Sequence, residues 1–198
     1  MRKSITLLQL LLIPILFLCA CSKIDKDKFE KLFLIGNEIE SSQKIGISYL
    51  DFNRKLQNFL SEKDLIDTDG FTKEEKSLYQ LYDDLLVAYQ HSHILWQLDS
   101  GDPHGNYSDF PNDYIRYEES ALYDNEKIIK KLKEIYNFNV ETIKYKVSGW
   151  DNYYRDHEAV NRDKAISKIW IKSSLIFSKI KKITTQKRSI WNLLSKKY

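Results

Sequence analysis

Cysteine, glycine and proline are scarce in this chain. Its 198 residues include two cysteines, six glycines and three prolines. Both cysteines, Cys19 and Cys21, lie near the N-terminus, so the rest of the chain has no thiol for a disulfide or for a cysteine-bound metal. Few glycines and prolines argue against an all-β domain, because such a domain needs a turn about every ten residues. These absences favour a helical fold.

The N-terminus combines positive charge with a short apolar run. Arg2 and Lys3 precede a stretch from Ile5 to Leu18 that is almost wholly apolar. This run is too short to span a bilayer, because a spanning helix needs about 20 apolar residues. A charged start followed by a short apolar core is typical of a secretory signal peptide.

The stretch LCAC at 18–21 follows this run directly. It resembles the lipobox of bacterial lipoproteins, which has Leu at −3, small residues at −2 and −1, and an obligatory Cys. The resemblance covers residues 1–22 and departs mildly at Cys19, where the family more often has Ala, Ser, Thr or Val. It implies that residues 1–20 are removed as a signal peptide and that the sulfur of Cys21 is acylated. A thiolate is a soft nucleophile and suits that reaction. The alternatives are an uncleaved anchor and a redox Cys-x-Cys pair.

The resemblance also implies a location. Residues 21–24 would form the lipidated anchor and a short linker, which hold the protein firmly because two or three acyl chains bind far better than one. In enteric lipoproteins an Asp after the acylated Cys tends to retain the protein at the inner membrane. Here that residue is Ser22. The resemblance therefore implies the cell envelope, with the protein on the outer membrane and facing the periplasm.

Residues 25–198 have the length and composition of a single domain, and their apolar residues recur at helical spacing. A first helix is predicted over about 25–62. Its apolar stripe consists of Ile45, Tyr49, Phe52, Leu56 and Phe59. A second helix begins at a capping box formed by Thr72 and Glu75. Its stripe consists of Leu78, Leu81, Leu85, Ala88, Ser92 and Leu95, with Tyr82, Tyr89 and Trp96 beside it.

A loop is expected from Asp99 to Asn112, and a third helix over about 114–135. One or two helices follow from Val140, with a break in the stretch RDHEAVNRDK. The last helix has heptad spacing. One row consists of Ile166, Ser173, Ile180, Lys187 and Leu194, and the other of Ile169, Ile176, Ile183 and Ile190. The sequence therefore predicts an all-α fold, a four- or five-helix bundle behind the lipoprotein signal peptide.

Acidic residues are absent from the C-terminal segment. From Lys164 to Tyr198 there are ten basic residues and no acidic one, whereas residues 24–163 carry a net charge of −10. We expect the acidic helices to neutralise this segment, because exposed lysines usually solvate a helix face. The alternative is contact with an anionic membrane surface or partner.

The candidate residues for that contact are Lys179, Lys181 and Lys182. Nucleic acid is not an expected partner, because an exported lipoprotein seldom meets it.

Three stretches approach metal-binding patterns without matching them. His91 and His93 are two residues apart and would point to opposite sides of a helix, so they cannot bind one ion together. His93 with His104 remains a weak candidate pair. In HEAVN, Asn161 stands where a zincin helix needs its second His. In LIDTDGFTKEEK, Lys76 stands where a calcium loop needs a bidentate Glu. No metal or cofactor is expected.

The stretch GWDNYYRDHE at 149–158 gathers residue types that stack on and hydrogen-bond ligands. Trp150, Tyr153 and Tyr154 are candidate binding residues. On a helix they would share a face with His157, so packing explains them as well, and it is the interpretation that we favour.

Two kinds of function fit these features. The first is non-enzymatic: a membrane-tethered envelope lipoprotein whose helical domain has a structural role or binds an envelope protein partner. The alternative is an envelope hydrolase or metal-dependent enzyme that uses the 99–113 loop with His91, His93 or His157. The sequence has no recognisable nucleophile, phosphate-loop or dinucleotide motif from which a reaction could be named. It therefore favours the non-enzymatic role.

Overall fold

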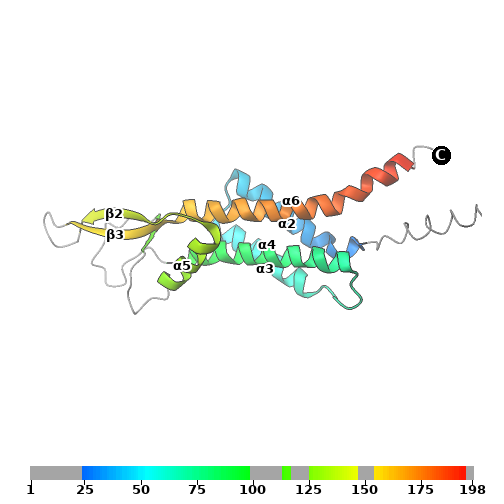
Figure 1. Cartoon of the computed structure of the whole chain (residues 1–198), viewed down its shortest axis with the longest axis horizontal. Coiled ribbons are helices and arrows are strands. Elements are labelled where there is room, and N and C mark those ends of the chain that lie inside the picture. The colour runs from blue at the N-terminus through cyan, green and yellow to red at the C-terminus, as the bar shows by residue number, and fades with distance from the viewer. Residues whose placement is uncertain (1–23, 99–112, 117–124, 147–153, 195–198) are drawn as a thin grey trace, which may run out of the picture.

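The structure is a computed structural model, and it describes residues 24–98, 113–116, 125–146 and 154–194. In chain order its elements are the 3₁₀ turn η1 (Asp27–Phe29), α2 (Glu30–Ile45), α3 (Tyr49–Asp64), α4 (Lys73–Gln97), β1 (Tyr114–Arg116), α5 (Asn125–Tyr136), β2 (Glu141–Lys146), β3 (Tyr154–Asn161) and α6 (Arg162–Leu194). Helices dominate the described residues, so the prediction of a mainly helical fold is confirmed (Figure 1).

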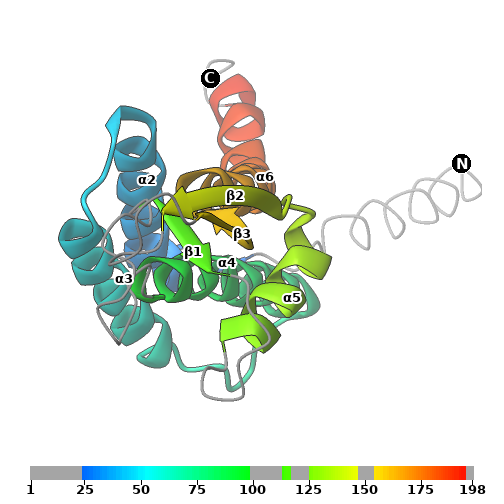
Figure 2. The same cartoon turned by 90° about the vertical axis from the view of Figure 1, so that its left-hand side faces the viewer.

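The longest helices, α4 and α6, lie side by side and run in opposite directions along the molecule (Figure 1). Helices α2 and α3 pack beside one half of this pair, and α5 and the strands lie toward its other end (Figure 2). The molecule is therefore elongated, with a helical half and a half that contains the sheet.

Each half has its own hydrophobic core. The core of the helical half lies between α2, α3, α4 and the middle of α6, and its buried members include Leu32, Ile39, Phe52, Phe59, Leu78, Leu85, Phe177 and Ile180. The core of the sheet half lies between the end of α4, α5, the strands and the start of α6, and its buried members include Leu95, Ile115, Ile129, Leu132, Val160, Ile166 and Ile169. Trp96 packs against both cores.

The predicted helix over 25–62 is wrong as a single element. It is divided at Gly46, whose φ of +89° is a conformation that glycine adopts without the strain a side chain would cause. The side chain of Ser48 then caps α3 by accepting a hydrogen bond from the Asp51 amide. Phe52, Leu56 and Phe59 are buried as predicted. Ile45, at the break, is 87% exposed.

Helix α4 agrees closely with the sequence. The predicted capping box is present, with the Glu75 amide donating to Thr72 Oγ1 and the Thr72 amide donating to Glu75 Oε2. The stripe that was expected to face the core is buried at five of its six positions, and Leu81 is half-buried. The flanking Tyr82 and Tyr89 are also buried.

The expectation of helix throughout the rest of the chain is wrong in three places. One is β2, which lies where a helix was expected to run from Val140. The third helix was placed over 114–135, but Tyr114–Arg116 is a strand and α5 begins only at Asn125. Of the stretch RDHEAVNRDK, in which a break between two helices was expected, RDHEAVN is most of β3 and RDK begins α6. β3 is the central strand of an antiparallel sheet of order β1-β3-β2, so it pairs on both sides. An all-α fold is therefore corrected to a mainly helical fold with a three-stranded sheet.

Helix α6 starts directly after β3 and fulfils the heptad prediction where its side chains are described. Ile166, Ile169, Ser173 and Ile180 are buried, and Ile176 and Ile183 are half-buried. The side chains of Lys187, Ile190 and Leu194 lie outside the described part. Gly36 of α2 lies against Phe177 so closely that a Cβ would stand 2.7 Å from a ring carbon. Any other residue at that position would displace the Phe177 ring.

Candidate functional site

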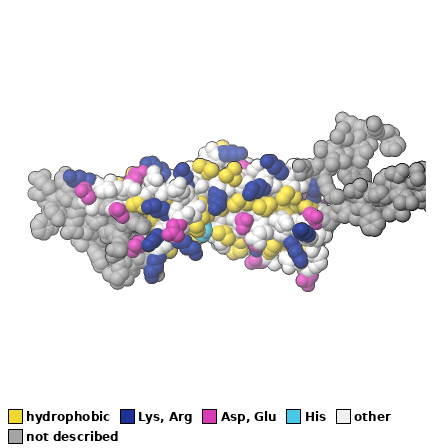
Figure 3. Space-filling model, viewed as in Figure 1, with side chains coloured by type: hydrophobic (Ala, Val, Ile, Leu, Met, Phe, Trp, Pro, Cys, Tyr) yellow, Lys and Arg dark blue, Asp and Glu magenta, His cyan; other side chains and the backbone are white. Residues whose placement is uncertain are grey.

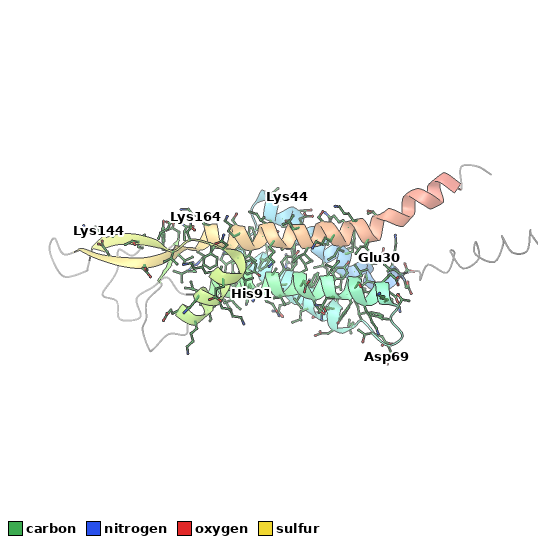
Figure 4. The ribbon with its side chains drawn as sticks, in the orientation of Figure 1. Glu30, Lys44, Asp69, His91, Lys144 and Lys164 are labelled. Atoms are coloured by element: carbon green, nitrogen blue, oxygen red, sulfur yellow. The ribbon has the colours of Figure 1, made fainter. Side chains whose placement is uncertain are left out.

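The candidate site is the end of the molecule at which the described chain begins and from which α6 projects. Figure 4 places Glu30 and Asp69 toward this end and Lys144 at the opposite end. Ile24, the first described residue, follows the predicted acylation site by three residues. A span of three residues covers at most about 10 Å. An acyl group on Cys21 would therefore hold this end of the molecule close to the membrane. Cys21 itself lies outside the described residues.

Glu75 fixes the first residues of the domain to the start of α4. The Asp25 amide donates to Glu75 Oε1 over 3.0 Å, and Lys28 Nζ lies 3.8 Å from the same oxygen. Only 3% of Glu75 is exposed. The amides of Thr72 and Asp25 hold the pKa of this carboxyl below its usual range, because they stabilise the charged form. The chain next to the predicted anchor is thus part of the packed domain.

Aromatic packing secures the same segment. The Phe29 ring is stacked on the Tyr82 ring at 5.8 Å between centroids, and it lies 5.7 Å from the Phe71 ring. Phe29 is 1% exposed. The sequence predicted the contact between Thr72 and Glu75 but gave no signal for the contacts that join residues 24–29 to α4.

Lys26 joins this end to α6. Its Nζ donates to the main-chain oxygen of Thr184. Helix α6 continues from there to Leu194 and extends past the other described helices (Figure 1). These last ten residues rise by about 15 Å. The predicted anchor and the end of α6 therefore lie at the same end of the molecule.

The lysines of α6 differ in their surroundings. Three of them contact described groups: Lys164 Nζ lies 2.8 Å from Glu141, Lys181 pairs with Glu40, and Lys172 lies over the Tyr136 ring. Lys179 and Lys182 are exposed and form no ion pair with any residue that the structure describes. The expected neutralisation by acidic neighbours thus applies to Lys164 and Lys181, which form ion pairs, and not to Lys179 and Lys182 among the described residues.

Lys181 is consequently distinct from the two lysines with which it was grouped. Besides its ion pair with Glu40 of α2, its Nζ lies 4.7 Å from the centroid of the Phe177 ring. Figure 3 shows other basic side chains spread between hydrophobic ones on one face of the molecule. Lys181 is placed to stabilise the packing of α2 on α6, while Lys179 and Lys182 are available to a partner.

The histidines of α4 face different elements, as their spacing predicts. His91 Nδ1 lies 2.7 Å from the Tyr136 hydroxyl of α5, whereas the His93 ring stacks on Tyr49 of α3 at 5.6 Å. Burial, aided by Lys131 and Lys172, lowers the pKa of His91 and favours its neutral form. His104 lies outside the described residues. Among those that the structure does describe, no group of three or more His, Cys, Asp or Glu side chains could hold a metal ion.

The aromatic candidates lie mostly outside the structure. Trp150 and Tyr153 are not among the described residues, and of Tyr154 only the backbone is described, as the first residue of β3. The helical face on which these residues were grouped with His157 is wrong, because Tyr154 and His157 both belong to a strand.

Of the 99–113 loop of the alternative hypothesis, residues 99–112 lie outside the described residues, but both flanks of this segment are described. The Arg162 guanidinium donates to the main-chain oxygen of Leu98 over 2.6 Å, and the Arg162 amide donates to that of Asp113 over 2.8 Å. The Asn161 side chain donates to the Asp113 carboxylate over 3.3 Å. The loop therefore starts and ends at the junction of β3 and α6.

A shallow groove between α2 and α6 exposes apolar side chains. Ile171 and Leu175, one turn apart on α6, are 57% and 62% exposed, and Gln43 and Lys44 of α2 face them. Trp170 completes the lining of this groove.

None of the described helices is both long enough and apolar enough to cross a bilayer. Comparison of the chain with protein families, with curated proteins and with solved structures gives no match.

Proposed function

We propose that this chain is an acylated protein of the cell envelope that acts as a non-enzymatic binding or structural module. In this proposal Cys21 carries the acyl chains, residues 1–20 are removed, and the protein sits on the outer membrane with its domain in the periplasm. The proposal rests on the lipobox-like stretch at 18–21.

The geometry of the described chain is compatible with such an anchor. Packing begins at Ile24 and Asp25, so only a short linker separates the domain from the predicted lipid. A linker of this length cannot carry the domain far from the membrane, and the anchored end faces the lipid surface. A protein held in this way works at or near the membrane surface.

Acylation is tested in living bacteria that produce the full-length chain. Cells are fed an alkyne fatty acid, and labelled protein is detected after gel electrophoresis. We expect the wild type and Cys19→Ser to be labelled and processed, because position −2 of the lipobox tolerates other small residues. Cys21→Ser should accumulate as an unlabelled precursor. Labelled and cleaved Cys21→Ser protein would refute the proposal.

Location is tested on the same cells by separating their membranes. Wild-type protein should sediment with the outer membrane. Ser22→Asp should move it to the inner membrane, while Ser22→Ala should leave it in place. Wild-type protein that sediments with the inner membrane would refute the outer-membrane assignment but leave acylation standing.

A further inference from the structure

We infer that the projecting end of α6, from Thr185 to Leu194, lies in the headgroup layer of the membrane that holds Cys21 and binds anionic phospholipid there, together with the exposed Lys179 and Lys182 that precede it. This inference rests on the proposed function, because it takes acylation of Cys21 as the reason for proximity. The partner is a phospholipid leaflet, not a protein or a nucleic acid.

Position is the first argument. The predicted anchor lies at most about 10 Å along the chain from Ile24. Two residues further on, Lys26 contacts the main chain of Thr184. The middle of α6 is thereby fixed near the point at which the chain leaves for the membrane. A helix that continues beyond this point enters the region of the lipid headgroups.

Length is the second argument. From Thr185 to Leu194 the helix rises about 15 Å, and no other described element accompanies it (Figure 1). The headgroup layer on each side of a bilayer is only about 5–8 Å thick. The projecting part is therefore long enough to reach through this layer or to lie along it.

Composition is the third argument. Residues 185–194 include the cations Lys187 and Arg188 and the apolar residues Ile190, Trp191, Leu193 and Leu194, with no acidic residue. Lys and Arg together with Trp and Leu are typical of helices that lie at a membrane interface. Ten residues are too few to cross the bilayer, so the segment suits the interface alone.

Charge is the fourth argument. Lys179 and Lys182 are exposed and without an ion pair among the described residues, and they immediately precede the projecting part. Each lysine near an anionic leaflet adds about 1 kcal/mol of attraction, which corresponds to about a fivefold change in partition. Lys181 does not belong to this set, because it pairs with Glu40.

The inference is tested with the fragment from Ser22 to Tyr198, which contains every residue of both hydrophobic cores and carries no lipid because it lacks Cys21. Its binding to vesicles of phosphatidylglycerol and phosphatidylethanolamine is measured by co-sedimentation, with phosphatidylcholine vesicles for comparison. We expect binding to the anionic vesicles only, and we expect it to weaken steeply as salt is added, because the attraction is screened.

Paired variants locate the contact. Lys187→Gln with Arg188→Gln should weaken binding about 25-fold, since each neutralised cation costs about fivefold. Trp191→Ser should weaken it further. The matched control is Lys130→Gln with Lys133→Gln on α5, which removes the same charge from exposed positions in the sheet half and should change vesicle binding little. Circular dichroism verifies that every variant keeps its helix content.

Two results would overturn the inference: a wild-type chain that ignores anionic vesicles at low salt, or two double variants that bind equally. Because the assay uses protein without lipid, its outcome is independent of acylation. Unlabelled wild-type protein in cells would refute the proposed function and leave the vesicle result standing, so the two failures are distinguishable.

Discussion

Glu75 shows how one buried carboxylate can hold several segments together. Its two oxygens accept hydrogen bonds from the amides of Asp25 and Thr72, which lie in separate parts of the chain. The negative charge of Glu75 is stabilised by these donors and by Lys28, so the carboxylate is buried without being left unpaired. Removing the charge would release the start of the domain from α4.

We expect Glu75→Gln to lower the free energy of unfolding by roughly 2 kcal/mol, because hydrogen bonds to a charged acceptor contribute about 1.5–3 kcal/mol. The pKa of Glu75 is lower in the folded protein than its ordinary value of 4.5, so its stabilising effect is complete above that value and is lost as the pH falls through the folded pKa. Urea unfolding at about pH 7 and pH 3.5 should show a smaller acid loss for the variant than for the wild type.

The control for this measurement is Glu134→Gln, which neutralises an exposed carboxylate on α5. It should leave stability at neutral pH nearly unchanged, as surface substitutions usually do. If Glu75→Gln behaved like this control, the buried hydrogen bonds would contribute nothing, contrary to the structure.

At the scale of elements, α6 changes its surroundings along its length. Its start packs against α5 and the strands, its middle against α2 and α4, and its end stands apart from the other described helices (Figure 1). Ile180 is fully buried in the middle section, whereas Leu175 is 62% exposed. The same substitution should therefore cost much more stability at Ile180 than at Leu175.

Ile180→Asp should lower the free energy of unfolding by about 3–5 kcal/mol, because it places an unpaired carboxylate in the core. Leu175→Asp should cost less than about 1 kcal/mol, because its side chain already meets solvent. Thermal melting followed by circular dichroism measures both. Equal loss of stability at the two positions would show that the packing of α6 differs from the one described.

The helices were predictable because their stripes are local patterns, and the sheet was missed because its partners are distant. Tyr114 pairs with Asn161, 47 residues away, and no local spacing reveals such a pair. A signal for β2 was present, since the strand contains Thr142, Ile143 and Tyr145, residue types that favour strands. The charged residues of RDHEAVN obscured β3.

The features of the candidate site were likewise predictable only where they are local in the sequence. The lipobox-like stretch at 18–21 is contiguous, so its resemblance is visible in the sequence, and so is the basic character of α6. The contact of Lys26 with Thr184 joins residues 158 apart, and the pairing of Lys181 with Glu40 joins residues 141 apart. These contacts distinguish Lys181 from the exposed Lys179 and Lys182. Only the folded structure brings their partner residues together.

At the scale of the whole molecule, the two cores share α4 and α6. Both helices contribute buried residues to each core. The centroid of the Trp96 ring lies 5.0 Å from that of Phe52 in one core. It lies 5.4 Å from that of Trp170, which packs against the other core. Unfolding of one half would remove packing contacts from the core of the other half. The described domain should therefore unfold as one unit.

Leu132→Ala tests this cooperativity from the sheet half. Leu132 is 2% exposed, so the change should cost about 2–5 kcal/mol. In native-state hydrogen exchange, protection of the most stable amides of α3 should fall by the same amount as protection of α5, although α3 belongs to the other core. Unchanged protection in α3 would mean that the halves unfold independently. Lys130→Gln, on the exposed side of α5, should alter neither.

The length of α6 has a consequence for what the protein can reach. Between Arg162, where the helix leaves the sheet, and Thr184, which Lys26 contacts, its axis rises about 33 Å. If acylated Cys21 holds one end at the lipid surface and the helix stands upright, the sheet is presented about 33 Å away from the membrane, in the periplasmic space. The helix would then act as a fixed spacer, and inserting or deleting turns between the two points would change the depth at which the sheet meets a partner.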